Sequence, residues 1–309
     1  LHPRVRRQRQ MCIRDRKNTM IQDIFPMHLS NEYHKKVPQA DSFLMIFKDN
    51  RILAKNDGQV CYLTYKELSE ICRGMGKEIP ACVYLFSIGE DDYFLTDPGE
   101  GIEVLGFVYY KMFETRTMQP KERVLAAATA WHLYVWYRDN VYCGRCGHKL
   151  VHSEKLRMLS CPDCNNMVFP KIAPAVIVGV TNGRKILMTK YANREYKRYA
   201  LIAGFTEIGE TAEETVAREV KEEVGLSVKN IRYYKSQPWG FDSNLLLGYF
   251  CELDDEGDVI RLDDEELACA EWVDFEDVPD DPEGLSLTRE MMLCFRDIMN
   301  ASESTCLHD

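Results

Sequence analysis

Two pairs of cysteines constrain the middle of this chain more than any other feature. Cys143 and Cys146 form one pair, and Cys161 and Cys164 the other, in the pattern C-x2-C-x14-C-x2-C. A two-residue spacing lets one tight turn aim both thiolates at a single ion, and two such turns complete a tetrahedral zinc site. Because four thiolates leave no open coordination position, we expect one structural Zn²⁺ per chain that stabilises folding and takes no part in catalysis.

A segment with two such cysteine pairs, called a zinc ribbon below, has a second interpretation as a module that binds nucleic acid or a partner protein. Few basic or imidazole side chains lie near the cysteines, namely His148, Lys149, His152, Lys155 and Arg157. The structural zinc site is therefore the favoured interpretation, and the binding module stays as the alternative.

Length and charge limit the broad class of protein. A chain of 309 residues predicts about two domains. No apolar run approaches the roughly 20 residues that a membrane-spanning helix needs. The formal net charge is −10, and residues 1–19 contribute +6 to it, so the remainder carries −16. An acidic body argues against non-specific binding to nucleic acid or to a membrane surface.

Residues 1–19 differ from the rest of the chain. They hold seven basic residues and one acidic residue, with no serine and no amphipathic period. We expect a non-native leader there, with Met20 as the native start. The eight cysteines outside the two pairs are scattered, which predicts thiols in a reduced, cytoplasmic compartment.

The pattern of apolar runs and turns predicts an α+β amino-terminal domain over residues 20–140. It predicts strands within residues 42–65 and 79–95 and a helix over residues 120–139. In the carboxy-terminal part, Asn182-Gly183 predicts a hairpin between strands at residues 173–180 and 185–190. Further expected elements are strands at residues 231–236 and 245–252, an acidic loop or hairpin at 254–266, and a helix at 287–299.

A glutamate-rich segment follows the hairpin. Thr211 and Glu214 have the spacing of a capping box, which begins a helix, and Gly225 has the position of its left-handed cap. The helix would turn Val216, Val220 and Val224 toward a core and bring three carboxylates to one face, those of Glu219, Glu222 and Glu223.

Such a face is usually only solvated. Here, however, Lys221 is the one basic residue interleaved with the carboxylates, and it lies on another side. Clustered carboxylate oxygens suit Mg²⁺ or Mn²⁺, and these ions activate water and stabilise charge on a diphosphate.

The segment from Gly204 to Leu226 resembles the Nudix box, G-x5-E-x7-R-E-U-x-E-E-x-G-U, at every fixed position. The resemblance implies that Glu219, Glu222 and Glu223 hold the catalytic ions, with the main-chain carbonyl of Ala203 as a further ligand. It also implies that Arg218 pairs with Glu210. Two or three Mg²⁺ or Mn²⁺ ions are expected, with Glu222 or Glu223 as the base that deprotonates water.

A second resemblance concerns the substrate. Residues 236–244, Ser-Gln-Pro-Trp-Gly-Phe-Asp-Ser-Asn, resemble the array S-Q-P-W-P-F-P-x-S of NADH pyrophosphatases, with Gly240 and Asp242 in place of two prolines and Asn244 at the last serine. The order of the parts along the chain is similar too: an amino-terminal domain, a four-cysteine ribbon, the Nudix segment and then this array. The resemblance implies that the nucleotide site is lined by Gln237, Pro238, Trp239, Gly240, Phe241, Asp242, Ser243 and Asn244.

The same resemblance gives four further expectations. Phe169 and Phe205 would flank or stack on a base, Glu266 would be a downstream metal ligand, and Thr288 would contact substrate. A homodimer is also implied. The expected fold is a Nudix α/β/α sandwich with a mixed sheet over residues 171–309, preceded by a zinc ribbon over 141–170 and the amino-terminal α+β domain.

The function that follows is hydrolysis of NADH or NAD⁺ to nicotinamide mononucleotide and AMP. Removal of NAD caps from RNA 5′ ends would use the same chemistry. The alternatives are a Nudix hydrolase that prefers ADP-ribose or another nucleoside diphosphate derivative and, from a different class, the ribbon as a nucleic-acid or partner-binding module.

Overall fold

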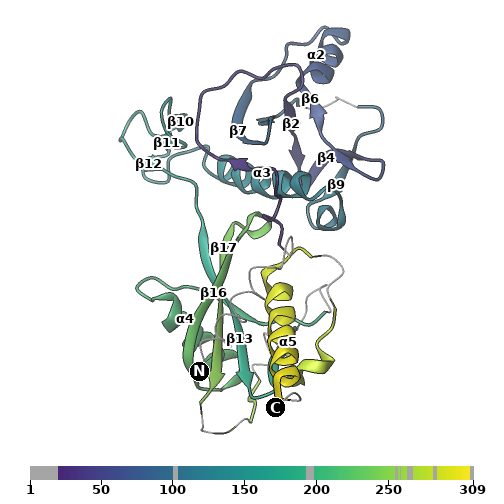
Figure 1. The fold of residues 1–309 in the computed structure, drawn as a ribbon. Helices are drawn as coiled ribbons and strands as arrows, with labels where there is room; N and C mark the ends of the chain where they lie inside the picture. Colours follow the sequence, from purple (N-terminus) through teal and green to yellow (C-terminus); the bar gives the residue numbers. More distant parts are fainter. Residues whose placement is uncertain are drawn as a thin grey trace. The chain divides into compact units, whose positions relative to one another are not determined.

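A computed structural model describes residues 20–99, 104–192, 198–254, 257, 259–262, 267–280 and 284–306. The chain divides into two compact units (Figure 1). The amino-terminal unit contains residues 24–172 and 239–243. The carboxy-terminal unit contains the described residues before 24, together with residues 173–238 and those from 244 onward. The expected leader, residues 1–19, lies outside the described residues.

The carboxy-terminal unit is built on a mixed sheet in the strand order β16-β17-β13-β14-β18, with β15 paired to β13. β13 runs parallel to β17 and antiparallel to β14 and β15. The bounds are β13 Ala173–Asn182, β14 Lys185–Tyr191, β15 Ile202–Phe205, α4 Ala212–Val224, β16 Val228–Trp239, η2 Gly240–Asp242, β17 Asn244–Leu253, β18 Leu267–Asp274, η3 Phe275–Asp277 and α5 Leu287–Cys306.

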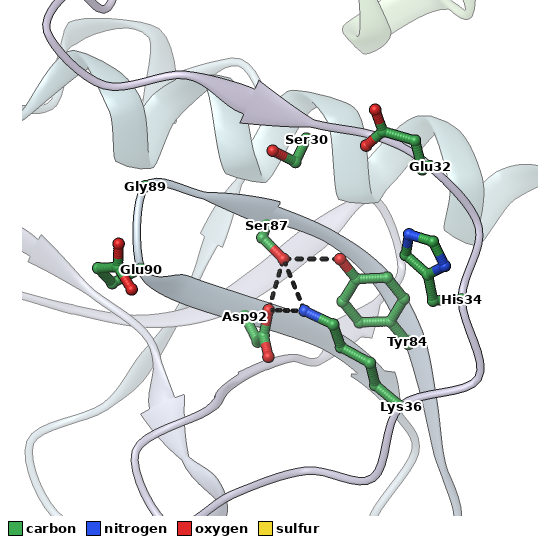
Figure 2. A pocket seen from close by; sticks show the side chains of 9 residues that line it. All are labelled: Ser30, Glu32, His34, Lys36, Tyr84, Ser87, Gly89, Glu90 and Asp92. Carbon is green, nitrogen blue, oxygen red and sulfur yellow. Dashed lines mark hydrogen bonds and ion pairs between the residues drawn. The ribbon is translucent and has the colours of Figure 1, made fainter.

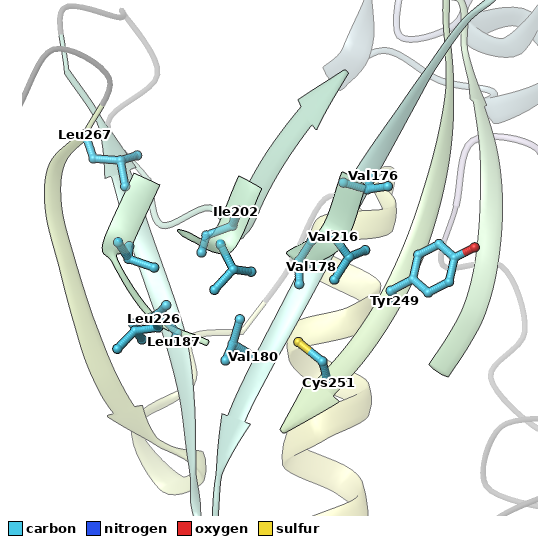
Figure 3. Close-up of a cluster of buried hydrophobic side chains, with 12 residues drawn as sticks. Val176, Val178, Val180, Leu187, Ile202, Val216, Leu226, Tyr249, Cys251 and Leu267 are labelled. Atoms are coloured by element: carbon cyan, nitrogen blue, oxygen red, sulfur yellow. The ribbon is translucent and has the colours of Figure 1, made fainter. Parts of the chain in front are cut away.

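Alternation along the strands places the two helices on opposite faces of this sheet. Val176, Val178 and Val180 of β13 pack with Val216, Val220 and Val224 of α4 in one buried cluster (Figure 3). On β17, Tyr249 belongs to that cluster, whereas Gly248 faces Leu287 and Met291 of α5. The expected α/β/α sandwich with a mixed sheet is therefore confirmed. By area, each fully buried valine contributes roughly 1.5–3 kcal/mol, which helps to offset the repulsion among the glutamates of α4.

The amino-terminal unit is also α+β, as expected. Its central helix, α3, begins after Pro120. Because its residues are apolar on most sides, it can be buried against strands of this unit. The bounds are β1 Leu29–Ser30, β2 Phe43–Met45, β3 Phe47–Lys48, β4 Arg51–Asn56, β5 Val60–Cys61, β6 Leu63–Thr64, α2 Tyr65–Gly74, β7 Cys82–Ile88, β8 Asp91–Thr96, β9 Val108–Lys111, η1 Glu114–Thr117 and α3 Lys121–Asp139. Its sheets have the orders β1-β7-β8-β2-β6 and β3-β4-β5, with β9 paired to β4.

The two cysteine pairs lie around a small three-stranded sheet in the same unit, with the order β10-β11-β12. Its strands are β10 Val151–His152, β11 Leu159–Ser160 and β12 Met167–Val168. The sheet is antiparallel, and each cysteine pair lies in a turn beside it.

Candidate metal centres and substrate residues

The four paired cysteines come together at one point of the ribbon. Their sulfur atoms all lie within 4.8 Å of one another, and the contacts between Sγ atoms include distances of 3.4 and 3.6 Å. Sulfurs held at about 2.3 Å from one ion in a tetrahedron would be about 3.8 Å apart. The donor set and its spacing therefore fit Zn²⁺, and none of the described cysteines forms a disulfide.

Backbone amides around the cluster favour thiolates. The amide of Arg145 donates to Cys143 Sγ at 3.4 Å and is the largest cause that lowers the pKa of this thiol to about 6, whereas desolvation and hydrogen bonds with the neighbouring thiols raise the pKa of Cys146. The backbone amide of Cys164 lowers the pKa of Cys161 in the same way. Because a zinc ligand must be deprotonated, these amides prepare the site for the ion.

Helix α4 begins and ends as the sequence predicts. Thr211 and Glu214 form a reciprocal capping box, and Gly225 closes the helix in the left-handed region at φ 73°. Two glutamates of this helix are nearly buried: Glu219 is 8% exposed and Glu223 is 2% exposed, whereas Glu222 lies on the exposed side. A carboxylate is costly to desolvate, so two of them on one buried helix face require compensating positive charge.

Gly204 explains where the Glu219 side chain sits. A Cβ at position 204 would lie 1.9 Å from Cδ of Glu219 and about as close to both carboxylate oxygens. The strand β15 therefore forms a cradle for this carboxylate that only glycine leaves open. The sequence pattern contained Gly204, but it gave no reason for glycine there.

Arg218 connects the loop before α4 to the glutamates of the helix. Its Nε donates to Glu210 at 2.6 Å, and its Nη1 donates to Glu219 at 2.7 Å and to Glu222 at 2.9 Å. Its Nη2 donates to the carbonyl of Phe205 at 2.9 Å. The hydrogen bond from Arg218, aided by the backbone amide of Glu207, lowers the pKa of Glu210 to about 2. Glu210 thus remains a carboxylate at neutral pH.

The carboxylate oxygens of α4 are donors of the kind that a hard divalent cation prefers. One of these carboxylates, that of Glu219, is held in the space that the missing side chain of Gly204 leaves. Among the described residues, the groups of metal-ligand side chains within 4.8 Å of one another are the four cysteines and Cys146 with His148 and Asp163. The three glutamates are not such a group. Ala203 lies in β15, opposite Ile177 of β13. Glu266 lies outside the described residues.

The substrate array is divided between the two units, since residues 236–238 belong to the carboxy-terminal unit and residues 239–243 to the amino-terminal one. Gln237 is fully buried, and its side-chain amide is bonded to Gln22, Leu285 and Leu287. Pro238 is exposed, and Asn244 begins β17.

The two departures from the array both have a structural reason within the amino-terminal unit. A Cβ at Gly240 would lie 2.2 Å from the backbone oxygen of Ala128 in α3, so a proline cannot be placed there without a shift. Asp242 accepts a hydrogen bond of 2.9 Å from Nε1 of Trp239, which is 9% exposed. Phe241 lies beside Trp239, with 5.0 Å between ring centroids, and Ser243 follows in the left-handed region.

Three further candidate side chains differ in exposure. Phe205 and Phe169 are both more than half exposed, the first at the end of β15 and the second just after β12. Thr288 is half-buried in the first turn of α5. More than half of the surface of each phenylalanine is thus exposed.

A polar hollow of about 490 Å³ lies elsewhere in the amino-terminal unit (Figure 2). Ser87 Oγ accepts or donates hydrogen bonds with Tyr84, Lys36 and Asp92, and Lys36 pairs with Asp92 at 2.7 Å. The remaining lining residues are Ser30, Glu32, His34, Gly89 and Glu90. None of the site residues predicted from the sequence lines this hollow.

Within the described part of the chain, no helix is both long enough and apolar enough to span a membrane.

Comparison with known proteins identifies two domains. Residues 171–292 match the NUDIX domain, and residues 138–169 match the NADH pyrophosphatase zinc ribbon domain. The cofactors expected from the sequence are accordingly supported: Zn²⁺ in the ribbon and Mg²⁺ or Mn²⁺ in the hydrolase domain.

Curated relatives agree with these domains. The NAD-capped RNA hydrolase NudC of Escherichia coli O9:H4 (strain HS) is 40% identical over 144 residues, which are 47% of this chain and 55% of that protein. NudC of Shigella boydii serotype 18 gives the same values. This chain thus spans about half the length of the curated relatives it matches.

Solved structures give weaker likenesses. A NUDIX hydrolase from Nitrosomonas europaea is 23% identical, covers 45% of this chain and 80% of its own, and has a TM-score of 0.38. The NUDIX domain of NrtR from Shewanella oneidensis, complexed with ADP ribose, is 16% identical, covers 42% of this chain and 90% of its own, and has a TM-score of 0.35.

Proposed function

We propose that this chain, in which a match to the NADH pyrophosphatase zinc ribbon domain is followed by a match to the NUDIX domain, is an enzyme that hydrolyses the pyrophosphate bond of NAD(H). The products are nicotinamide mononucleotide and AMP. The observation that carries this proposal is the pair of nearly buried carboxylates, Glu219 and Glu223, on a helix that matches the Nudix box. Such carboxylates are stabilised by divalent cations, and those cations suit a diphosphate substrate.

The proposed roles follow the positions of the side chains. Glu219, Glu222 and Glu223 would hold Mg²⁺ or Mn²⁺, with Ala203 and Glu266 as further ligands. When bound, these ions lower the pKa of water and neutralise charge on the phosphates. Arg218 and Glu210 fix the loop before α4, because the guanidinium bonds both to Glu210 and to the carbonyl of Phe205.

In the proposed reaction, a water oxygen attacks one phosphorus of the diphosphate and forms a new P–O bond. The bond between that phosphorus and the bridging oxygen breaks, and the bridging oxygen leaves with the other phosphate. Glu222 or Glu223 accepts the proton of the attacking water. Each product then carries one of the two phosphates, which gives the two mononucleotides.

Nicotinamide dinucleotides are favoured as substrates by the class of the ribbon and by the residues that match the pyrophosphatase array. We propose that Phe205, Asn244 and Thr288 contact the nucleotide in the carboxy-terminal unit. Phe169, Pro238 and residues 239–243 remain predicted contacts as well. The name of the relatives, NAD-capped RNA hydrolase, favours a second candidate substrate, an RNA whose 5′ end carries NAD.

The test is a comparison of initial rates on NADH, NAD⁺, ADP-ribose and NAD-capped RNA, each with Mg²⁺ and with Mn²⁺. We expect release of nicotinamide mononucleotide from at least one of the NAD-containing substrates at a higher kcat/KM than cleavage of ADP-ribose. A strong preference for ADP-ribose would overturn the substrate and leave the hydrolase chemistry intact. No cleavage of any of the four would overturn both.

We also propose a homodimer in the cytoplasm. The proposal rests on the resemblance to NADH pyrophosphatases and on cysteines that are expected to stay reduced. Sedimentation velocity of the full chain checks the dimer. Fractionation of cells that express it checks the compartment.

A further inference from the structure

The side chain of Gln237 has no surface open to a ligand. It is fully buried, and its Nε2 donates to the carbonyl of Leu285 at 2.9 Å and to Oε1 of Gln22 at 3.2 Å. Its Oε1 accepts from the backbone amide of Leu287 at 2.7 Å. A glutamine amide has two N–H donors, so both are already used.

The partners of Gln237 form one connected group. Gln22 donates its own Nε2 to the carbonyl of Ser236 at 3.1 Å, and the amide of Ile21 donates to the carbonyl of Leu285 at 3.0 Å. Residues more than 200 positions apart in the sequence thus share one hydrogen-bonded node. We call Gln22, Gln237, Leu285 and Leu287 the amide node.

The amide node lies at the beginning of α5. Leu287 is the first residue of this helix, and the N–H groups of a first turn have no partner inside their own helix. Gln237 satisfies the N–H of Leu287 from strand β16, so it acts as a cap supplied from elsewhere in the chain. The next residue of the helix is Thr288.

A second attachment holds α5 to the same strand one turn later. The carboxylate of Glu290, fully buried, accepts from Tyr234 and Lys235 of β16, each at 2.7 Å. Gly248 of β17 lets the helix approach closely, because a Cβ there would lie 2.8 Å from Sδ of Met291. The position of Thr288 is therefore fixed between two points at which α5 is bonded to β16.

We propose that Gln237 is a positioning residue: with Gln22 it fixes the beginning of α5, and hence Thr288, and it does not itself contact the substrate. The inference rests on the proposed function in taking Thr288 as a substrate contact. It changes the role that the sequence pattern implies for Gln237. It also gives a role to Gln22, which no motif singles out.

The experiment compares three variants of the full chain. Gln237→Met removes all three hydrogen bonds of the side chain at similar volume. Gln22→Ala removes the bonds from Gln22 to Gln237 and Ser236 but leaves Gln237 its bonds to Leu285 and Leu287. Gln39→Ala is the matched control, because Gln39 is an exposed glutamine whose side chain bonds to the carbonyl of Val37.

Two quantities are measured for each variant. The first is hydrogen exchange of the backbone amides of residues 285–290. The second is KM and kcat on whichever of the four test substrates the unaltered chain cleaves best. Loss of a buried hydrogen bond changes an equilibrium by about tenfold, so Gln237→Met should speed exchange at Leu287 and raise KM by about that factor. Gln22→Ala should do the same to a smaller extent, about threefold, and Gln39→Ala should do neither.

The outcomes separate positioning from direct contact. If Gln237→Met raises KM while exchange at residues 285–290 stays unchanged and Gln22→Ala has no effect, Gln237 touches substrate and the proposal is wrong. Unchanged exchange in both variants would also overturn it. If the unaltered chain cleaves none of the four substrates, the proposed function fails, whereas the exchange data still decide whether the amide node fixes α5.

Discussion

The carboxylate of Glu219 lies in the space where a side chain at Gly204 would begin, with Cδ of Glu219 only 1.9 Å from the place of a Cβ. The two residues are 15 positions apart, on β15 and α4. The position of a proposed metal ligand is thus set by the absence of a side chain on the neighbouring strand.

Gly204→Ala should therefore impair the reaction far more than a one-carbon change suggests. The added methyl must displace the Glu219 carboxylate, and misplacing a reacting group by about 1 Å can cost about a hundredfold in rate. We expect kcat/KM on the best substrate to fall by about that factor, measured at saturating Mg²⁺ or Mn²⁺.

The matched control is Gly74→Ala, at the end of α2. Gly74 has open space around its Cβ position and helical backbone, so alanine there should leave activity unchanged and stabilise the helix by up to about 1 kcal/mol. If Gly204→Ala keeps near-normal activity, the cradle does not place Glu219 for catalysis.

Glu223→Gln tests the proposed base and metal ligand. Glu223 is 2% exposed and lies with Glu219 on the buried side of α4. Because the amide has the shape of the acid without its charge or basicity, kcat should fall by about 10²–10⁴. Glu213→Gln is the control, because Glu213 is an exposed glutamate of the same helix. Near-normal cleavage by Glu223→Gln at saturating Mg²⁺ would show that the role is misassigned.

The Arg218–Glu210 pair predicts how acid affects stability. Hydrogen bonding from Arg218 lowers the pKa of Glu210 from 4.5 to about 2 in the folded chain. A lowered carboxyl pKa stabilises the fold fully above the unfolded value, and this contribution is lost as the pH falls from about 4.5 toward 2. Relative to Glu210→Gln, the unaltered chain should therefore lose more stability across that window. Urea unfolding of both chains at pH 6, 4.5 and 3 measures the difference, and parallel curves would contradict the prediction.

Much of the fold and of the proposed site could be predicted from local patterns. The capping box at Thr211, the cap at Gly225 and the hairpin signalled by Asn182-Gly183 each depend on neighbouring residues. All three are present, although the turn of the hairpin is Gly183-Arg184, because Asn182 still pairs with Lys185. The convergence of the four cysteines on one site could be predicted for the same reason, because the two-residue spacing within each pair suits the geometry of one metal ion. Helix α2 was not predicted, although Thr64 and Glu67 form a capping box that could have indicated it.

What sequence reasoning missed depends on contacts between distant segments. The collision of a Cβ at Gly204 with Glu219 arises only after β15 and α4 have packed together. The bond between Gln22 and Gln237 joins residues 215 positions apart, so no short pattern contains it. For the same reason, Gly240 was recognised only as a departure from the array, and its close approach to Ala128 became apparent in three dimensions.

The ribbon predicts one zinc ion per chain. Cys164→Ser should reduce the zinc content from about one ion to near zero and unfold the ribbon, because three thiolates no longer complete the site. Cys61→Ser, at an exposed cysteine outside the ribbon, should keep the ion. Elemental analysis of the purified chains measures the content. A full zinc complement in Cys164→Ser would contradict a four-thiolate site.

Gly240→Pro restores the residue that the NADH pyrophosphatase array has at this position, and we expect it to destabilise this chain. Any Cβ at position 240 meets the backbone oxygen of Ala128 at 2.2 Å, and a helix backbone cannot move aside as a flexible side chain can. Overpacking of this kind costs about 1–3 kcal/mol. Asp242→Asn is the control, since an amide oxygen can still accept the hydrogen bond from Trp239. Thermal unfolding followed by tryptophan fluorescence should show a lower midpoint for Gly240→Pro than for Asp242→Asn. Equal midpoints would mean that α3 and residues 239–243 are not packed closely enough to exclude a side chain at position 240. The close approach of Ala128 would then not explain why this chain has glycine there.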